Sequence, residues 1–185
     1  MAQSTGAPGP DLPAELAHLS WLIGRWGGIG EGGYPSISPF RYEQVVEFAT
    51  DGRPFLEYRS VSWLVDEANN RIRRSATESG YWRPRPDNGV ELLLAHPTGF
   101  AEVWIGQVEV TAIHDARVTG ARIELTTDSV ARTESAKEVA AGHRLYGLID
   151  GRLLSTYDMA AVGHPLSNHL AIALEPIGPG PDLEP

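Results

Sequence analysis

A histidine near the end of the chain has surroundings that suit a metal ligand. His169 lies in a run over residues 159–174 that reads as a strand after a Gly/Pro turn. Strand alternation puts His169, Ala171 and Ala173 on one face and the larger apolar residues between them on the other. An imidazole beside two methyl-sized side chains leaves room for a large, flat group, such as a metal-centred macrocycle that takes one axial ligand. On spacing alone, a hydrogen-bonded structural histidine is the alternative.

The other five histidines show no metal-site spacing. His96 precedes Pro97 in a turn signal, so we interpret it as a turn residue. His164 has the opposite strand parity to His169, which argues against both binding one metal ion, although His164 could support His169 as a neighbour. The remaining three are interpreted as surface or core residues: His18, His114 and His143.

Carboxylates and arginines give no catalytic pattern. Glu31, Glu43, Glu47 and Glu57 are scattered, and no pair of them can be assigned acid–base roles. No Ser/His/Asp arrangement stands out either. A carrier of fatty acids would need a buried basic residue to meet the carboxylate. The sequence does not place any arginine inside the fold, the candidates being Arg41, Arg59 and Arg144.

A glycine–tryptophan motif opens the strand-rich part of the chain. Residues 24–30 have the form GxWxGxG, with Gly24, Trp26, Gly28 and Gly30 at the fixed positions. Glycine weakens a strand unless the strand bends sharply or lies close to another backbone, so the motif predicts barrel curvature, with Trp26 filling the closed end. The GxGxxG spacing of a dinucleotide site and the Gly-Lys-Ser/Thr of a phosphate loop are both absent.

The remaining pattern predicts short strands separated by turns. Residues 13–23 favour a short helix or turn, and about ten strand candidates follow, with 117–126 and 129–133 as separate segments. Asn88-Gly89 is a strong hairpin signal. We therefore predict an all-β, ten-stranded, antiparallel up-and-down barrel, with a sandwich as the alternative. The expected organisation is a flexible tail over 1–13, a barrel domain over 14–176 and a second flexible tail over 177–185.

Composition restricts the class of protein. The 185 residues are 42% hydrophobic and 21% charged, which is typical of a soluble globular domain. No apolar stretch approaches the roughly 20 residues of a membrane helix. The net charge of −9 argues against nucleic acid or an anionic membrane as a partner. The absence of cysteine excludes disulfides and thiolate chemistry and fits the cytoplasm, our expected location.

The entry motif resembles that of the lipocalin and fatty-acid-binding-protein group, and further segments narrow the resemblance. Eight segments, in this order, are similar to the nitrobindin family and span roughly Leu16 to Leu174: residues 31–37, 39–42, 54–58, 78–83, 94–99, 132–137, 158–163 and 165–170. Any one of these segments is weak evidence, but eight in order are strong evidence.

The nitrobindin resemblance implies a ten-stranded barrel that binds ferric haem b. It also implies isomerisation of peroxynitrite to nitrate, an enzymatic activity, and binding of nitric oxide. His169 matches the family's axial ligand to the haem iron. Two weaker carry-overs place Ser36 and Lys137 in contact with the haem, because Ser36 stands where the family often has Thr and Lys137 belongs to a Thr-x-x-Ala-Lys segment.

Three departures from the family pattern put haem affinity and rate in doubt more than the fold. Trp82 stands where a smaller apolar residue is usual, His164 where Gln is common, and Glu175 where basic residues are usual. Two other functions stay open at this point. One is a non-enzymatic carrier of an apolar small molecule, and the other is a nitric-oxide sensor or store. The oligomeric state is also open, with a homodimer among the options.

Overall fold

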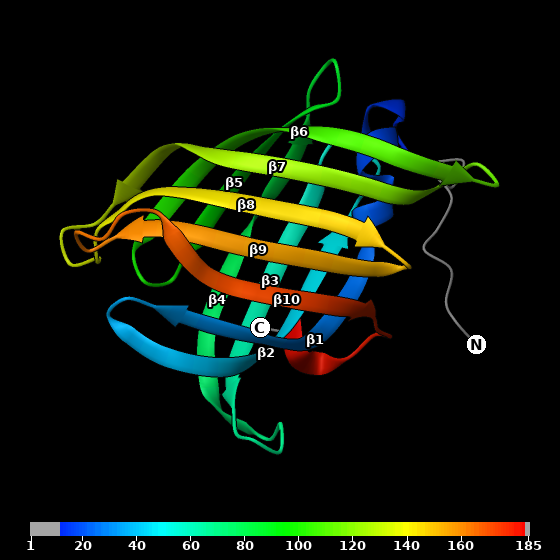
Figure 1. The fold of residues 1–185 in the computed structure, drawn as a ribbon. Coiled ribbons are helices and arrows are strands. Elements are labelled where there is room, and N and C mark those ends of the chain that lie inside the picture. The colour runs from blue at the N-terminus through cyan, green and yellow to red at the C-terminus, as the bar shows by residue number, and fades with distance from the viewer. Residues whose placement is uncertain (1–11, 184–185) are drawn as a thin grey trace.

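Ten antiparallel strands follow one short helix in the computed structural model, which describes residues 12–183 (Figure 1). The expected tail over 1–13 lies almost wholly outside the described residues. The elements are η1 (Ala14–Leu22), β1 (Gly24–Tyr34), β2 (Ile37–Ala49), β3 (Leu56–Val65), β4 (Arg71–Pro84), β5 (Gly89–His96), β6 (Phe100–His114), β7 (Arg117–Arg132), β8 (Val139–Ile149), β9 (Arg152–Ala161), β10 (Ser167–Pro176) and η2 (Pro181–Leu183).

The strands form one closed barrel. Each strand pairs with its neighbours in the chain, and β1 also pairs with β10, which closes the sheet. This confirms the predicted up-and-down barrel rather than a sandwich. The short helix before β1 is also confirmed, as the 3-10 helix η1. Full closure leaves no free sheet edge, which suits a chain with so many strands.

One boundary prediction is wrong. Segments 117–126 and 129–133 are not separate strands but one strand, β7, and the polar residues between them form a bulge against β6. Val103 pairs with Ser129 while Trp104 pairs with Thr127, so Asp128 is the extra residue. Thr127 Oγ1 accepts a hydrogen bond from the Gly142 amide at 2.7 Å. A bulge therefore absorbs the polar residues that resemble a turn in the sequence.

Close backbone approach explains the glycines of the GxWxGxG motif. A Cβ at Gly28 would lie 2.4 Å from the Ala173 carbonyl oxygen, and one at Gly30 would lie 2.6 Å from that of Ala171. Gly24 has a φ of +130°, which favours glycine. Trp26 is buried, and its Nε1 donates to the Leu22 carbonyl at 2.8 Å. The motif thus lets β1 pack tightly against β10.

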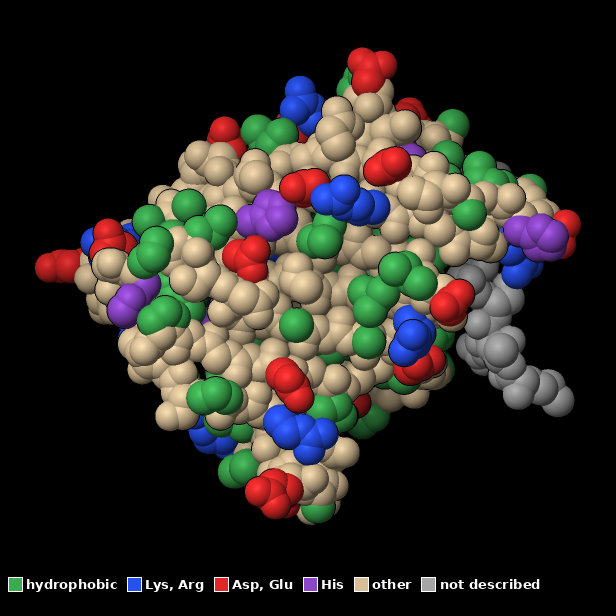
Figure 2. All heavy atoms as spheres, in the orientation of Figure 1, with side chains coloured by type: hydrophobic (Ala, Val, Ile, Leu, Met, Phe, Trp, Pro, Cys, Tyr) green, Lys and Arg blue, Asp and Glu red, His purple; other side chains and the backbone are tan. Residues whose placement is uncertain are grey.

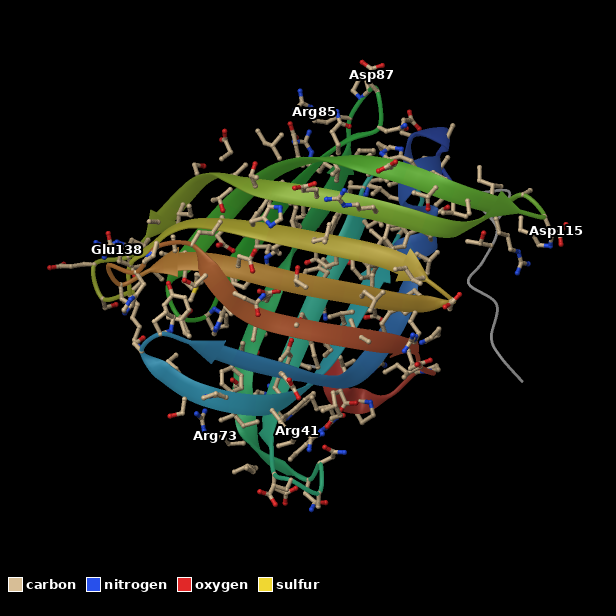
Figure 3. All side chains as sticks on the ribbon, in the orientation of Figure 1. Arg41, Arg73, Arg85, Asp87, Asp115 and Glu138 are labelled. Atoms are coloured by element: carbon tan, nitrogen blue, oxygen red, sulfur yellow. The ribbon has the colours of Figure 1, made fainter. Side chains whose placement is uncertain are left out.

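The two ends of the barrel differ. One end is covered by η1, whose buried residues join the main core: Leu16, Leu19, Trp21 and Leu22. The other end carries the connections 35–36, 97–99, 133–138 and 162–166, which we call the rim. Thr133 N donates to Gly99 O at 2.8 Å and Val162 N donates to Glu138 O at 3.2 Å, so neighbouring rim segments are joined. Figure 3 shows Glu138 at the rim and Asp115 at the far end.

Residues after β10 contact the outside of the barrel. The sequence predicts a flexible tail over 177–185. In the structure, Ile177 N donates to Arg25 O at 2.9 Å, and Asp182 accepts from Arg71 at 2.7 Å. Leu183 packs against the outer cluster that contains Val45. The described part of this segment therefore lies along the barrel surface.

The surface in Figure 2 mixes acidic and basic side chains over this face, with apolar side chains scattered between them.

No helix among residues 12–183 is both long and apolar enough to span a membrane.

Candidate functional site

His169 lies at a β-bulge near the start of β10. Asn168 pairs with Asp158 and Leu170 pairs with Tyr157 of β9, so His169 is the extra residue between them. The prediction that His169 shares a face with Ala171 and Ala173 is therefore wrong. Ala171 is exposed on the outer face, whereas the His169 ring contacts the inward-facing Tyr157. The bulge resets the alternation, which simple two-residue periodicity cannot predict.

A backbone carbonyl orients the His169 ring. His169 Nδ1 lies 2.9 Å from the Gly33 carbonyl oxygen of β1. A carbonyl only accepts, so Nδ1 carries the proton of the neutral ring and donates it to Gly33. Nε2 then keeps its lone pair, and no described residue forms a hydrogen bond with it. This is the usual second interaction of a metal-ligating histidine, in which the non-ligating nitrogen is tied to a carbonyl.

Aromatic rings surround the half-buried imidazole. The ring centroids of Tyr34, Phe40 and Tyr157 lie 5.7, 6.2 and 6.0 Å from that of His169, all in edge-on or near edge-on contact. A groove of about 860 Å³ lies at the surface between the β1–β2 and β3–β4 ends, and its lining includes Gly33 and Phe40 but not His169 itself. The volume is within the range of small-molecule and cofactor sites.

A bare metal ion has no site in the part of the chain that is described. Residues 12–183 contain no group of three or more His, Asp or Glu side chains placed to hold an ion. A single imidazole can serve as a ligand only when the other ligands come with the metal, as in a haem. The donor set at His169 therefore fits a haem iron and does not fit a protein-only metal centre.

The barrel interior holds a buried ion pair that the sequence did not reveal. Arg144 of β8 is buried, and its Nη2 lies 2.6 Å from Glu78 Oε1 of β4. The Tyr58 hydroxyl donates to the other oxygen of Glu78 at 3.0 Å. The guanidinium also stacks over the Tyr157 ring, 4.4 Å from its centroid. Arg144 thus links the interior polar groups to the residue that contacts His169.

The charge of Arg144 sets the ionisation of Glu78. Burial alone would raise the pKa of Glu78, but attraction to Arg144 and the hydrogen bonds from Arg144 and Tyr58 outweigh it and lower the pKa to about 2. Glu78 in turn raises the pKa of Arg144, against the effect of burial. Both side chains therefore carry full charge at neutral pH and neutralise each other.

A second buried carboxylate lies beside this pair. Glu102 Oε2 lies 4.0 Å from Arg144 Nη2 and 2.9 Å from His96 Nε2, and it accepts a hydrogen bond from Trp104 Nε1 at 3.3 Å. The interpretation of His96 as a turn residue is confirmed for its backbone, because the His96 carbonyl accepts a hydrogen bond from Gly99 N at 3.0 Å, but it does not account for the buried ring. His96 ends β5, and its largely buried ring stacks on Phe100 with centroids 3.9 Å apart. His96 is therefore both the last residue of β5 and the first residue of the turn over 96–99.

Large side chains fill the barrel below the rim. Trp82, one of the departures from the nitrobindin pattern, is fully buried and contacts Phe48, Tyr58 and Tyr146. The cavity that remains beside Arg144 is only about 30 Å³, enough for a water molecule but not for an organic ligand. The surface groove lined by Gly33 and Phe40 is thus far larger than this interior cavity.

Of the other residues that the sequence singled out, Ser36, Lys137 and His164 lie at the rim and Glu175 lies at the far end. Ser36 is exposed in the β1–β2 turn and Lys137 is exposed before β8, and no described residue bonds to either side chain. His164 lies in the β9–β10 connection, and its ring stands edge-on to Tyr34 at 5.6 Å. Glu175 is exposed on the outer face near the far end of β10. The structure therefore brings His164 near His169 through Tyr34 and leaves Ser36 and Lys137 at the periphery.

A family model described as "THAP4-like, heme-binding beta-barrel domain" matches residues 15–175. The chain belongs to this family. The match spans η1 and all ten strands up to the last residues of β10, including the bulge that carries His169.

Curated relatives of this haem-binding barrel carry two names. The chain is 49% identical over 162 residues to a peroxynitrite isomerase of Nocardioides sp., a match that covers 87% of this chain and 93% of the relative. It is 44% identical over 175 residues to a peroxynitrite isomerase of Salinispora tropica, covering 92% and 84%. It is 42% identical over 180 residues to a ferric nitrobindin-like protein of Kineococcus radiotolerans, covering 89% and 94%.

A solved structure has the same architecture. The crystal structure of Rv2717c from M. tuberculosis superposes with a TM-score of 0.82 at 37% sequence identity, and the match covers 90% of this chain and 99% of that chain. The family and the barrel fold expected from the nitrobindin resemblance are thus confirmed.

Proposed function

We propose that this protein is a ferric haem b-binding peroxynitrite isomerase in which His169 Nε2 is the axial ligand. The observation that carries the proposal is the hydrogen bond from His169 Nδ1 to the Gly33 carbonyl, which leaves Nε2 as the free donor in a member of a haem-binding family. Relatives named peroxynitrite isomerase, 43–49% identical to this chain, support the assigned reaction. A haem iron held by one histidine would keep a coordination position that can accept nitric oxide.

His169 and the residues around it would hold and orient the cofactor. The neutral His169 ring binds the iron only in one tautomer, and the Gly33 carbonyl selects that tautomer by accepting the Nδ1 proton. The rings of Tyr34, Phe40 and Tyr157 restrict the imidazole to one orientation. Bound haem supplies one open coordination position at which peroxynitrite can be converted to nitrate. Ser36 and Lys137 are proposed to contact the haem periphery, where a lysine could pair with a propionate.

No acid–base residue is required from the chain. Conversion of ONOO⁻ to NO₃⁻ conserves atoms and charge, so no net proton is taken up or released. The rings in contact with His169 are the aromatic rings of Tyr34, Phe40 and Tyr157. We place the reaction in the cytoplasm, consistent with a chain that lacks cysteine.

The interior argues against the fatty-acid carrier. The buried arginine that such a carrier needs is present as Arg144, but Glu78 already neutralises it. A carboxylate ligand would have to displace Glu78 and find room beside Trp82, where the cavity is about 30 Å³. A nitric-oxide store or sensor would use the same haem. It would differ from the isomerase in that catalytic conversion of peroxynitrite to nitrate would not be its function.

Nitrate formation by the haem-loaded protein tests the proposal. Peroxynitrite is mixed with reconstituted wild type, His169→Ala and His114→Ala, and with free haem at the same iron concentration. His114 is a matched control because it lies exposed in the β6–β7 hairpin. We expect wild type and His114→Ala to form nitrate faster than free haem and His169→Ala to lose this advantage. A wild-type rate equal to that of free haem would favour the store or sensor instead.

A further inference from the structure

Gly33, the residue that orients His169, is not held by regular strand pairing. The ladder between β1 and β10 runs only as far as the pair Gly32–Leu170. On the other side, the register between β1 and β2 shifts between Gly32 and Tyr34. Gly33 lies past the last β1–β10 pair and within the β1–β2 register shift, so regular strand pairing does not fix the direction of its carbonyl. Another interaction must therefore hold this carbonyl in place.

Tyr34, the next residue, bonds to the end of β9. Its hydroxyl accepts a hydrogen bond from Ala161 N at 2.8 Å. The hydroxyl also lies 3.1 Å from Met159 O and 3.2 Å from Ala161 O, to which its single proton can be donated. Tyr34 is buried, with Val139 and Ala161, in a small cluster at the rim. Three backbone atoms of β9 therefore fix the position of this side chain.

These contacts bridge β10 on its inner side. In the barrel order, β10 lies between β1 and β9, so a side chain that joins the ends of β1 and β9 passes across the start of β10. The Tyr34 ring contacts two imidazoles edge-on, with its centroid 5.7 Å from that of His169 and 5.6 Å from that of His164. His169 therefore contacts the Tyr34 ring and bonds to the carbonyl of the adjacent Gly33.

We infer that Tyr34 is a positioning residue for His169: by anchoring the end of β1 to β9, its hydroxyl holds the Gly33 carbonyl that selects the ligating tautomer. This inference rests on the proposed role of His169 as haem ligand. It assigns Tyr34 no contact with substrate, and it predicts that loss of the hydroxyl alone loosens the imidazole while the ring contacts remain.

The test uses Tyr34→Phe, with Tyr81→Phe as the control. Tyr81 is half exposed and packs on Phe55, and no described residue bonds to its hydroxyl. The first readout is the ring ¹⁵N spectrum of His169 in the haem-free proteins. Wild type and Tyr81→Phe should show one neutral tautomer with the proton on Nδ1, and Tyr34→Phe should show both. The second readout is haem affinity, which should fall about 10-fold or more in Tyr34→Phe only.

The outcomes separate this inference from the proposed function. An unchanged His169 tautomer and unchanged haem affinity in Tyr34→Phe would overturn the positioning role. Haem affinity that is unaffected by His169→Ala would overturn the ligand assignment, while the tautomer measurement, made without haem, would still decide the role of Tyr34. If Tyr34→Phe does not fold, amide exchange of Ala161 in wild type decides it. Slow exchange supports the hydrogen bond to Tyr34, and exchange as fast as in a free peptide contradicts the inference.

Discussion

Arg144 and Glu78 join two strands, β8 and β4, that share no ladder, through a buried ion pair with 2.6 Å between Nη2 and Oε1. The pair ties opposite walls of the barrel together below the rim. Because both charges are removed from water, each is stable only while the other is present. This relationship controls both the stability of the barrel and what its interior can accept.

Glu78→Gln should destabilise the fold strongly. The change leaves the Arg144 guanidinium buried without its main counter-charge, at a cost of about 3–5 kcal/mol in the free energy of unfolding. Glu91→Gln is the matched control, because the partners of Glu91 among residues 12–183 are two exposed arginines, Arg83 and Arg85, and the change should cost about 0–1 kcal/mol. Urea denaturation at neutral pH measures both. An equal loss of unfolding free energy in the two variants would show that the buried pair stabilises the fold no more than an exposed pair does.

Acid should remove the contribution of Glu78. Its pKa is lowered to about 2 in the folded protein, so as pH falls the unfolded chain takes up the proton first. The stabilisation is therefore complete above the ordinary glutamate pKa of about 4.3 and is lost as pH falls from there towards 2. Unfolding free energies measured over this window should fall more steeply in wild type than in Glu78→Gln. Parallel profiles would contradict the assignment.

Gly28→Ala should weaken the closure between β1 and β10. The new Cβ would lie 2.4 Å from the Ala173 carbonyl oxygen, so the backbone must shift, at a cost of about 1–3 kcal/mol. Gly147→Ala serves as the control, since a Cβ there meets nothing closer than Ala121 O at 3.8 Å. Thermal unfolding should show a lower Tm for Gly28→Ala and an equal or higher Tm for Gly147→Ala. A Gly28→Ala Tm equal to that of wild type would refute the close approach.

A long-chain fatty acid should not enter the barrel. The interior cavity of about 30 Å³ is far below the roughly 300 Å³ at which small-molecule pockets begin. A brominated fatty acid inside the barrel would quench the fluorescence of the buried Trp82 and Trp104. Titration should therefore give no saturable quenching. Stoichiometric quenching would revive the carrier function.

Periodicity and turn chemistry predicted the barrel well. The GxWxGxG motif, the Asn88-Gly89 hairpin and alternating strands all follow from local rules about backbone freedom and burial, and the closed ten-stranded barrel has these features. The bulges at Asp128 and His169 were not predictable, because an extra residue is set by the partner strand and leaves no local signal.

The candidate site was only partly predictable. His169 was found from its small neighbours, Ala171 and Ala173, although those residues face the other way, and the family resemblance made it specific. The pairing of Arg144 with Glu78 and of Glu102 with His96 depends on strands far apart in the chain. One cue was available in the sequence. Glu78 lies four residues before the buried Trp82 and Glu102 lies two residues before the buried Trp104, so strand alternation places both carboxyl groups on the inner face.

The central claim is that His169 ligates a haem iron through Nε2. The most direct test is the visible spectrum of wild type, His169→Ala and His114→Ala after reconstitution with ferric haem. The account predicts stoichiometric haem uptake, with a Soret band typical of histidine-ligated ferric haem in wild type and His114→Ala, and a band that is weakened or shifted in His169→Ala. No stoichiometric uptake by wild type, or three identical spectra, would contradict it.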